Sequence, residues 1–137
     1  MKIRIITISI ILINYLNLSG QNNDRTYLAH DHSESMLYSY AVAEIIIHSD
    51  STYTWKTWEL KNKKDWEKYN LFKPKISTGK VTQKAEFYTL TEYRNGNETD
   101  FNFTVKISDR RLTFYYPNKR NKLRKTYTYK RIKKINE

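Results

Sequence analysis

Short stretches in which apolar and polar residues alternate dominate this chain and restrict it to a β-fold. The clearest stretch is 99–108, where Phe101, Phe103, Val105 and Ile107 alternate with polar residues. Alternation with a period of two places one set of side chains on each face of a strand. Similar stretches cover residues 40–48, 52–60, 75–83, 84–93, 111–116 and 123–132. The sequence therefore predicts an all-β domain of about seven to eight strands.

The connections between these stretches are short, which favours pairing of consecutive strands. Asn95-Gly96 is the strongest short hairpin signal in the chain. Tight turns between consecutive strands favour an antiparallel meander, and closure into a small barrel or half-barrel would remove the sheet edges. One short helix is expected within 61–74, where it would cover a barrel end or a sheet edge before Pro74 stops it.

The stretch TYTWKTWEL, residues 52–60, does not keep its large side chains in one phase. Tyr53 and Trp55 are odd-numbered, whereas Trp58 and Leu60 are even-numbered. One extra residue near Lys56-Thr57 would reconcile the two phases, so we predict a β-bulge that bends the strand. The alternative is a regular strand that carries aromatic side chains on both faces.

The first residues have the layout of a secretory signal peptide. Lys2 and Arg4 precede an apolar run over 5–16, and a small polar exit follows. This order predicts that residues 1–20 are a cleaved leader and that the protein is exported, either to the periplasm or out of the cell. The alternative is a membrane anchor, which the run disfavours because a spanning helix needs ~20 apolar residues.

The remaining chain divides by pattern into three parts. Residues 21–37 are polar and aperiodic and predict a flexible segment, residues 38–134 predict a single β-domain, and residues 135–137 form a tail. The chain has no cysteine. Its stability must therefore come from the hydrophobic core without disulfides, and thiolate metal sites and thiol nucleophiles are excluded.

Two stretches give the chain a family resemblance. HSDSTYTW resembles a first hairpin in which a polar turn leads into an aromatic strand, and RLTFYYPNKRNKLRKTYTYKRI resembles a pair of closing strands. Together they make residues 42–132 similar to small exported lipocalin-like proteins of Bacteroidetes-type bacteria. The Gly-x-Trp signature of true lipocalins is absent. The resemblance implies a small antiparallel barrel whose ligand, if any, would sit in the barrel mouth.

No pattern in the sequence predicts catalysis, a metal or a cofactor. The motifs G-x-S-x-G and H-E-x-x-H and a phosphate-binding loop are absent from the sequence. His30 and His32 could share one side of a strand, but no third strong ligand accompanies them. Alternation would put Glu86 and Glu92 on the polar face. We therefore expect solvated side chains here and a protein that is not an enzyme, the alternative being an uncharacterised hydrolase.

The abundant aromatic residues provide the first set of candidate binding residues. In a small barrel many of these side chains simply fill the interior, and that is one interpretation. The other is a partly open mouth that takes an apolar or amphipathic small molecule. The candidate ligand-binding residues are Tyr53, Trp55, Trp58, Phe87, Phe101 and Phe103.

The last third of the chain is strongly basic. No acidic residue lies between Asp109 and Glu137, and tyrosines interleave with the cations. Such a surface can hold an anionic envelope glycolipid or polysaccharide, which suits an exported protein better than nucleic acid does. The alternative is that the charges protect a strand edge from aggregation. The candidate anion-binding residues are Arg111, Lys119, Arg120, Lys122, Arg124, Lys125, Lys130 and Arg131.

These observations predict an exported, non-enzymatic binding protein. Its partner would be a small apolar or amphipathic molecule in the barrel, or an anionic envelope component on the basic face. The alternative is a structural or protein–protein interaction module of the cell envelope, with a filled core and an exposed strand edge that pairs with a partner.

Overall fold

The computed structural model describes residues 23–133, and the predicted leader lies outside this range. Within this range, eight strands and one short 3₁₀ helix follow one another. They are β1 (Arg25–His32), β2 (Tyr40–Ile47), β3 (Thr52–Leu60), η1 (Lys63–Leu71), β4 (Lys75–Lys84), β5 (Phe87–Arg94), β6 (Asn97–Ile107), β7 (Arg111–Pro117) and β8 (Leu123–Ile132). No helix in the described range is both long and apolar enough to cross a membrane.

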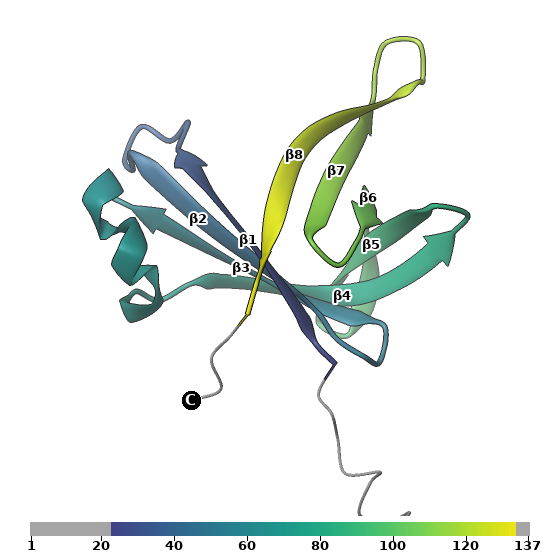
Figure 1. The fold of residues 1–137 in the computed structure, drawn as a ribbon, viewed down its shortest axis with the longest axis horizontal. Helices are drawn as coiled ribbons and strands as arrows, with labels where there is room; N and C mark the ends of the chain where they lie inside the picture. Colours follow the sequence, from purple (N-terminus) through teal and green to yellow (C-terminus); the bar gives the residue numbers. More distant parts are fainter. Residues whose placement is uncertain (1–22, 134–137) are drawn as a thin grey trace, which may run out of the picture.

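The strands form a closed antiparallel barrel in which each strand pairs with the next (Figure 1). β1 closes the barrel by pairing with β8. The prediction of a small antiparallel meander with one short helix is therefore confirmed, and the sheet closes fully rather than forming a half-barrel.

β1 corrects the prediction that residues 21–37 are a flexible segment. Residues 25–32 pair along their whole length with β2 and over three residues with β8. Alternation in the sequence does not reveal this strand, because few of its side chains are large and apolar. Tyr27 is fully buried in the barrel, whereas Leu28 packs on the outer face. Backbone pairing with two neighbours therefore secures a strand that its own hydrophobicity does not reveal.

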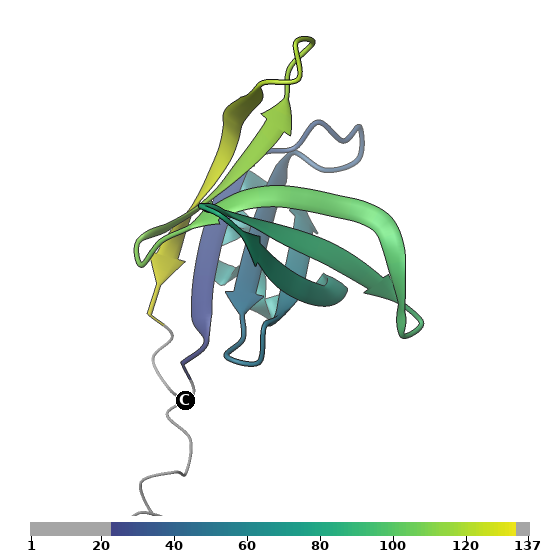
Figure 2. The same ribbon diagram turned by 90° about the vertical axis from the view of Figure 1, so that its right-hand side faces the viewer.

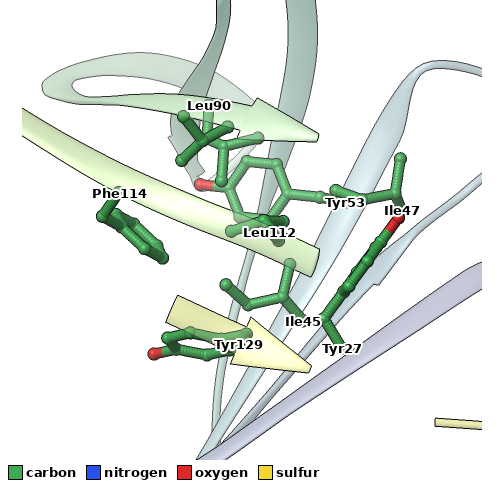
Figure 3. Packing of buried hydrophobic residues seen from close by; sticks show 9 residues of the cluster. Tyr27, Ile45, Ile47, Tyr53, Leu90, Leu112, Phe114 and Tyr129 are labelled. Atoms are coloured by element: carbon green, nitrogen blue, oxygen red, sulfur yellow. The ribbon is translucent and has the colours of Figure 1, made fainter. Parts of the chain in front are cut away.

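The middle of the barrel is filled by one apolar cluster (Figure 3). Tyr27, Tyr53, Leu90 and Leu112 are almost completely buried there. Tyr27 also donates a 2.7 Å hydrogen bond from its hydroxyl to the carbonyl of Ser108. Close packing of this kind divides the barrel interior, so any ligand space lies at the ends rather than through the centre.

Gly79 allows β4 to pass close to this cluster. It pairs with Tyr53 on one side and with Glu92 on the other. A Cβ atom at this position would lie 1.9 Å from the Thr91 carbonyl oxygen and 2.7 Å from the Tyr53 ring. The strand therefore requires glycine here because no side chain fits between its neighbours.

β3 is regular, so the predicted bulge near Lys56-Thr57 is wrong. Its pairing with β2 runs from Tyr53 to Leu60 without a shift in register. Tyr53 belongs to the interior cluster, whereas Trp58 and Leu60 form a second cluster on the outer face of the sheet. The large side chains change phase because both faces of this strand are covered.

The cover on the outer face is η1, which lies against β2 and β3 (Figure 1). Trp66 stacks on the His30 ring with centroids 4.0 Å apart, and the Tyr69 hydroxyl donates to Glu44 at 3.2 Å. The Trp58 indole donates a 2.9 Å hydrogen bond to the carbonyl of Phe72, where the helix ends. The expected helix is thus present, but it covers the sheet face rather than a barrel end or a sheet edge.

Irregular pairing occurs instead in two pairs of strands. The β5–β6 register shifts between Thr91 and Tyr93, and the β7–β8 register shifts between Thr113 and Tyr115. Extra residues in one partner bend and coil a strand, which helps a sheet to close. Figure 2 shows the strong curvature of β6 that accompanies the first shift.

The meander gives the barrel two distinct ends. Connections β1–β2, β3–β4, β5–β6 and β7–β8 share one end, which we call the helix end because it carries η1. Connections β2–β3, β4–β5 and β6–β7 lie at the other end, together with the start of β1 and the end of β8. We call this the terminal end.

Candidate functional site: an aromatic opening and a basic arm

A cavity of about 370 Å³ opens at the helix end between β3, β4, β5 and β6. Trp55 lies at its base and meets aromatic rings from three other strands. The ring centroids lie 5.2 Å away for Phe103, 5.4 Å for Phe114 and 6.4 Å for Tyr129. Phe101 lines the wall and is 56% exposed. The cavity therefore has an aromatic floor and an apolar wall that is partly open to solvent.

The polar part of this cavity is an ordered network around Glu92. Ser77 donates a 3.0 Å hydrogen bond to one carboxylate oxygen, and Arg94 donates at 3.2 Å to the other. The Arg94 guanidinium also lies over the Phe101 ring, 5.8 Å from its centroid. Cation, carboxylate and aromatic face thus meet at the rim, where a polar ligand group could be held.

Two polar groups, the Trp55 indole N–H and the Tyr129 hydroxyl, are buried behind the floor of the opening. The indole nitrogen of Trp55 is buried and makes no hydrogen bond of standard geometry. The Tyr129 hydroxyl lies near it. Burial raises the pKa of Tyr129 well above its ordinary value, Tyr116 adds to the rise, and the indole N–H partly offsets it. A buried donor is costly to leave unpaired, so the nearby Tyr129 hydroxyl helps to compensate the Trp55 indole N–H.

The structure brings together half of the predicted aromatic set. Trp55, Phe101 and Phe103 line the opening. Tyr53 is part of the packed interior below them and is 1% exposed. The other two members lie elsewhere.

Trp58 and Phe87 lie on the outer surface of the sheet. Trp58 packs beneath η1. Phe87 packs edge-on against Tyr115 and lies under the Lys106 ammonium, 4.7 Å from the ring centroid. Strand parity explains both placements, because Phe87 has the phase opposite to Leu90, which faces the interior.

The polar residues of the opening were missed by reasoning from sequence. Glu92 was expected on the polar face, yet it shares the phase of Leu90 and lines the cavity. Its phase was readable in the sequence once Leu90 was taken as core. Arg94 and Ile76 also line the cavity, and their positions depend on how the strands curve at this end.

The β7–β8 hairpin forms the second part of the site. β7 pairs with β6 only up to Tyr115, and β8 pairs with β1 only from Lys130 onward. Residues 116–127 therefore have no strand partner outside this hairpin in the described chain. We call this segment the basic arm. Figure 2 shows it projecting from the barrel at the helix end.

The tip of the basic arm is an ordered loop that gathers four cations. The Asn118 side-chain oxygen accepts hydrogen bonds from the backbone N–H groups of Arg120 and Lys122, both at 2.9 Å. Asn118 also lines a surface hollow of about 480 Å³ with Lys119, Arg120, Lys122 and Arg124. A loop held in this way keeps the cations together despite their repulsion, which suits an anionic partner.

The other predicted basic residues are dispersed. Lys125 lies on the basic arm opposite Tyr115. Arg111 and Lys130 pair across β7 and β8 nearer the terminal end. Arg131 lies 3.7 Å from the Asp109 carboxylate and lines a different cavity. Half of the predicted anion-binding residues therefore form one cluster at the arm tip, and the other four lie apart from it.

A cavity of about 660 Å³ at the terminal end contains the chain's most hydrogen-bonded histidine. His48 lies between Asp24, at 2.8 Å from Nδ1, and Thr54, at 2.9 Å from Nε2. This order resembles a hydrolase triad, but Thr54 does not line the cavity. Nucleophilic catalysis requires an accessible nucleophile beside oxyanion donors. We therefore interpret these three side chains as a structural hydrogen-bond network that joins the segment before β1 to the β2–β3 hairpin.

Comparison with known proteins gives no family for this chain. No family model, no curated protein sequence and no solved structure matches it.

Proposed function

We propose that this protein binds an amphipathic small molecule in the aromatic opening at the helix end. The observation that carries the proposal is that Trp55 and Phe103 line an accessible cavity, with Phe114 and Tyr129 packed against Trp55 behind them. Binding sites for small molecules are typically concave, mostly apolar and equipped with a few polar groups. The opening has this composition because the Glu92 network lies at its rim.

The proposed ligand has an apolar body and a polar head. The body would rest against Trp55, Phe101 and Phe103. The head would lie at the rim near Arg94. The filled centre of the barrel limits the ligand to this end.

The protein is proposed to act after export, in the periplasm or outside the cell, and without catalysis. The leader-like residues 1–20 support export. A binding role is supported by the chemistry of the opening, whose one lining carboxylate, Glu92, is already held by Ser77 and Arg94.

Titration with anilinonaphthalene sulfonate, an aromatic anion that fluoresces in apolar sites, tests this proposal. We expect saturable binding with energy transfer from tryptophan. Phe101→Ser should weaken binding about tenfold, because it removes apolar area from the wall. Phe101 is already half exposed, so the variant should keep its cooperative thermal transition.

Gln83→Ala is the matched control, because Gln83 lines the cavity at the terminal end instead. It should leave the probe affinity unchanged. Weaker binding in Gln83→Ala with full binding in Phe101→Ser would place the probe at the wrong end and contradict the proposal. Lack of saturable binding to the folded wild type would do the same.

A second candidate is an interaction module that pairs its strand edge with a partner. β1 and β8 share only three residue pairs, so 29–32 and 123–127 present free edges towards the helix end. Exposed edges accept extended segments. Lys125 and the irregularity in β8 oppose such pairing, which is why this candidate is second. Hydrogen exchange of the isolated protein tests this candidate. If the 123–127 amides that do not bond to β7 exchange slowly, the edge is already covered and pairing with a partner is ruled out.

A further inference from the structure

The exposed apolar side chains of the described chain are concentrated at one end of the barrel. Met36 and Leu37 in the β1–β2 connection are 102% and 80% exposed. Leu71 and Phe72, at the end of η1, are 78% and 47% exposed, and Ile76 at the start of β4 is 60% exposed. All of them lie at the helix end, because the meander brings alternate connections together.

The remaining exposed apolar residues extend this surface along the adjoining strands. Phe101 lies in the half of β6 nearest the helix end, and Tyr116, Leu123 and Tyr127 lie on the basic arm. At the terminal end, the connections that the structure describes carry no large exposed apolar side chain. Such one-sided exposure marks an interaction surface, whereas scattered exposed residues do not.

Cations lie beside these apolar residues in the sequence and at the same end. Residues 61–75 contain six lysines but only two carboxylates, Asp65 and Glu67. The basic arm adds the four cations of its tip and no acid. Leu71-Phe72 precedes Lys73, and Leu123 lies between Lys122 and Arg124. Apolar side chains flanked by cations are typical of segments that enter an anionic membrane interface.

We infer that the helix end docks onto the surface of an anionic lipid bilayer. The apolar residues stand on separate connections rather than in one groove, so the partner must accept several separate tips at once. A fluid bilayer surface does this, and its negative charge complements the lysines and the arm tip. The inference rests on the proposed binding role of the helix end, and it names the surface from which the amphipathic ligand would come.

Sedimentation with lipid vesicles tests the inference on the folded protein expressed without residues 1–20. We expect partitioning onto vesicles of phosphatidylcholine and phosphatidylglycerol in equal parts, and much less onto phosphatidylcholine alone. The double variant Lys119→Gln/Arg120→Gln should lose about thirtyfold in partitioning, because each surface cation near an anionic membrane contributes about fivefold. Met36→Ser/Leu37→Ser should lose about tenfold through lost apolar burial.

Arg110→Gln/Arg111→Gln is the matched control, since it removes the same charge from two exposed residues at the terminal end. It should lose far less than the arm variant. Equal losses in the two charge variants would overturn the inference, because they would indicate attraction without orientation. Failure of the wild type to sediment with anionic vesicles would also overturn it, including the case in which the same residues instead mediate self-association.

Vesicle sedimentation and titration with anilinonaphthalene sulfonate can give opposite outcomes, so they test the two proposals separately. None of the four vesicle-test substitutions on the helix end replaces a residue that lines the aromatic opening. These variants should therefore bind anilinonaphthalene sulfonate normally. Loss of vesicle binding with normal probe binding would separate docking from ligand binding, whereas failed probe binding by the wild type would count against the proposed function alone.

Discussion

Gly79→Ala should be among the most damaging single-methyl changes in this protein. The new Cβ would lie 1.9 Å from the carbonyl oxygen of Thr91, whereas a carbon and an oxygen ordinarily approach to about 3.3 Å. The obstacle is backbone in a paired strand, so it cannot rotate away as a side chain would. Either β4 separates from β5 or the barrel distorts around Tyr53.

The expected cost lies at the upper end of what overpacking produces, about 3 kcal/mol. For a domain of this size that corresponds to a fall of about 10–15 °C in the thermal midpoint. Chemical denaturation followed by tryptophan fluorescence would give the free energy of unfolding, and circular dichroism would give the midpoint. The wild type and the variant should be compared in the same buffer and at the same protein concentration.

Two further variants separate the causes. Gly96→Ala meets no atom within 4 Å but has a positive φ of 79°, so it should cost only the left-handed strain of about 1 kcal/mol. Adding Tyr53→Leu to Gly79→Ala should not restore stability, because the Thr91 carbonyl is nearer than the ring. A Gly79→Ala protein as stable as wild type, or one rescued by Tyr53→Leu, would refute the reasoning.

Two other predictions concern the docking of η1. Trp58→Phe should cost about 1–2 kcal/mol in chemical denaturation because it removes the 2.9 Å hydrogen bond to the Phe72 carbonyl, and Trp66→Phe should cost less because the phenyl ring can still stack. Burial, with help from the Glu44 charge, raises the pKa of Tyr69 from 10.0 to about 12. The unfolded chain therefore loses this proton first, and the free energy of unfolding should fall as pH rises from 10.0 to about 12. Tyr69→Phe should show a shallower fall over the same range, and an identical pH dependence would contradict the assignment.

Strands covered on one face could be predicted from the sequence, and strands covered on both faces could not. In β6, Phe103 and Val105 face the interior as the alternation indicated. In β3 the same rule failed, because Trp58 packs under a helix on the opposite face from Tyr53. A change of phase can thus arise from a second apolar environment as well as from a bulge, and only the position of η1 distinguishes the two.

The candidate site was predictable to a similar degree. The cations at the arm tip lie within six consecutive residues, 119–124, so the hairpin turn brings them together without help from the rest of the fold. The opening instead combines residues from four strands, and Trp55 meets Phe114 and Tyr129 only because the sheet closes. Contacts across a barrel depend on closure and tilt, which the alternation of single strands does not encode.

The packed centre of the barrel connects the proposed ligand site with the proposed docking surface. Tyr27, Tyr53 and Leu90 close the interior, so a molecule resting on Trp55 can enter and leave only through the helix end. The same end carries the exposed apolar residues and the basic arm. If that end rests on a bilayer, an amphipathic molecule can pass between membrane and opening without its apolar body crossing water, which removes the main barrier to its transfer.

A variant that docks less, such as Lys119→Gln/Arg120→Gln, should therefore bind a water-soluble probe normally yet extract a fluorescent fatty acid from anionic vesicles more slowly. Equal extraction rates in wild type and variant would show that docking and exchange are separate.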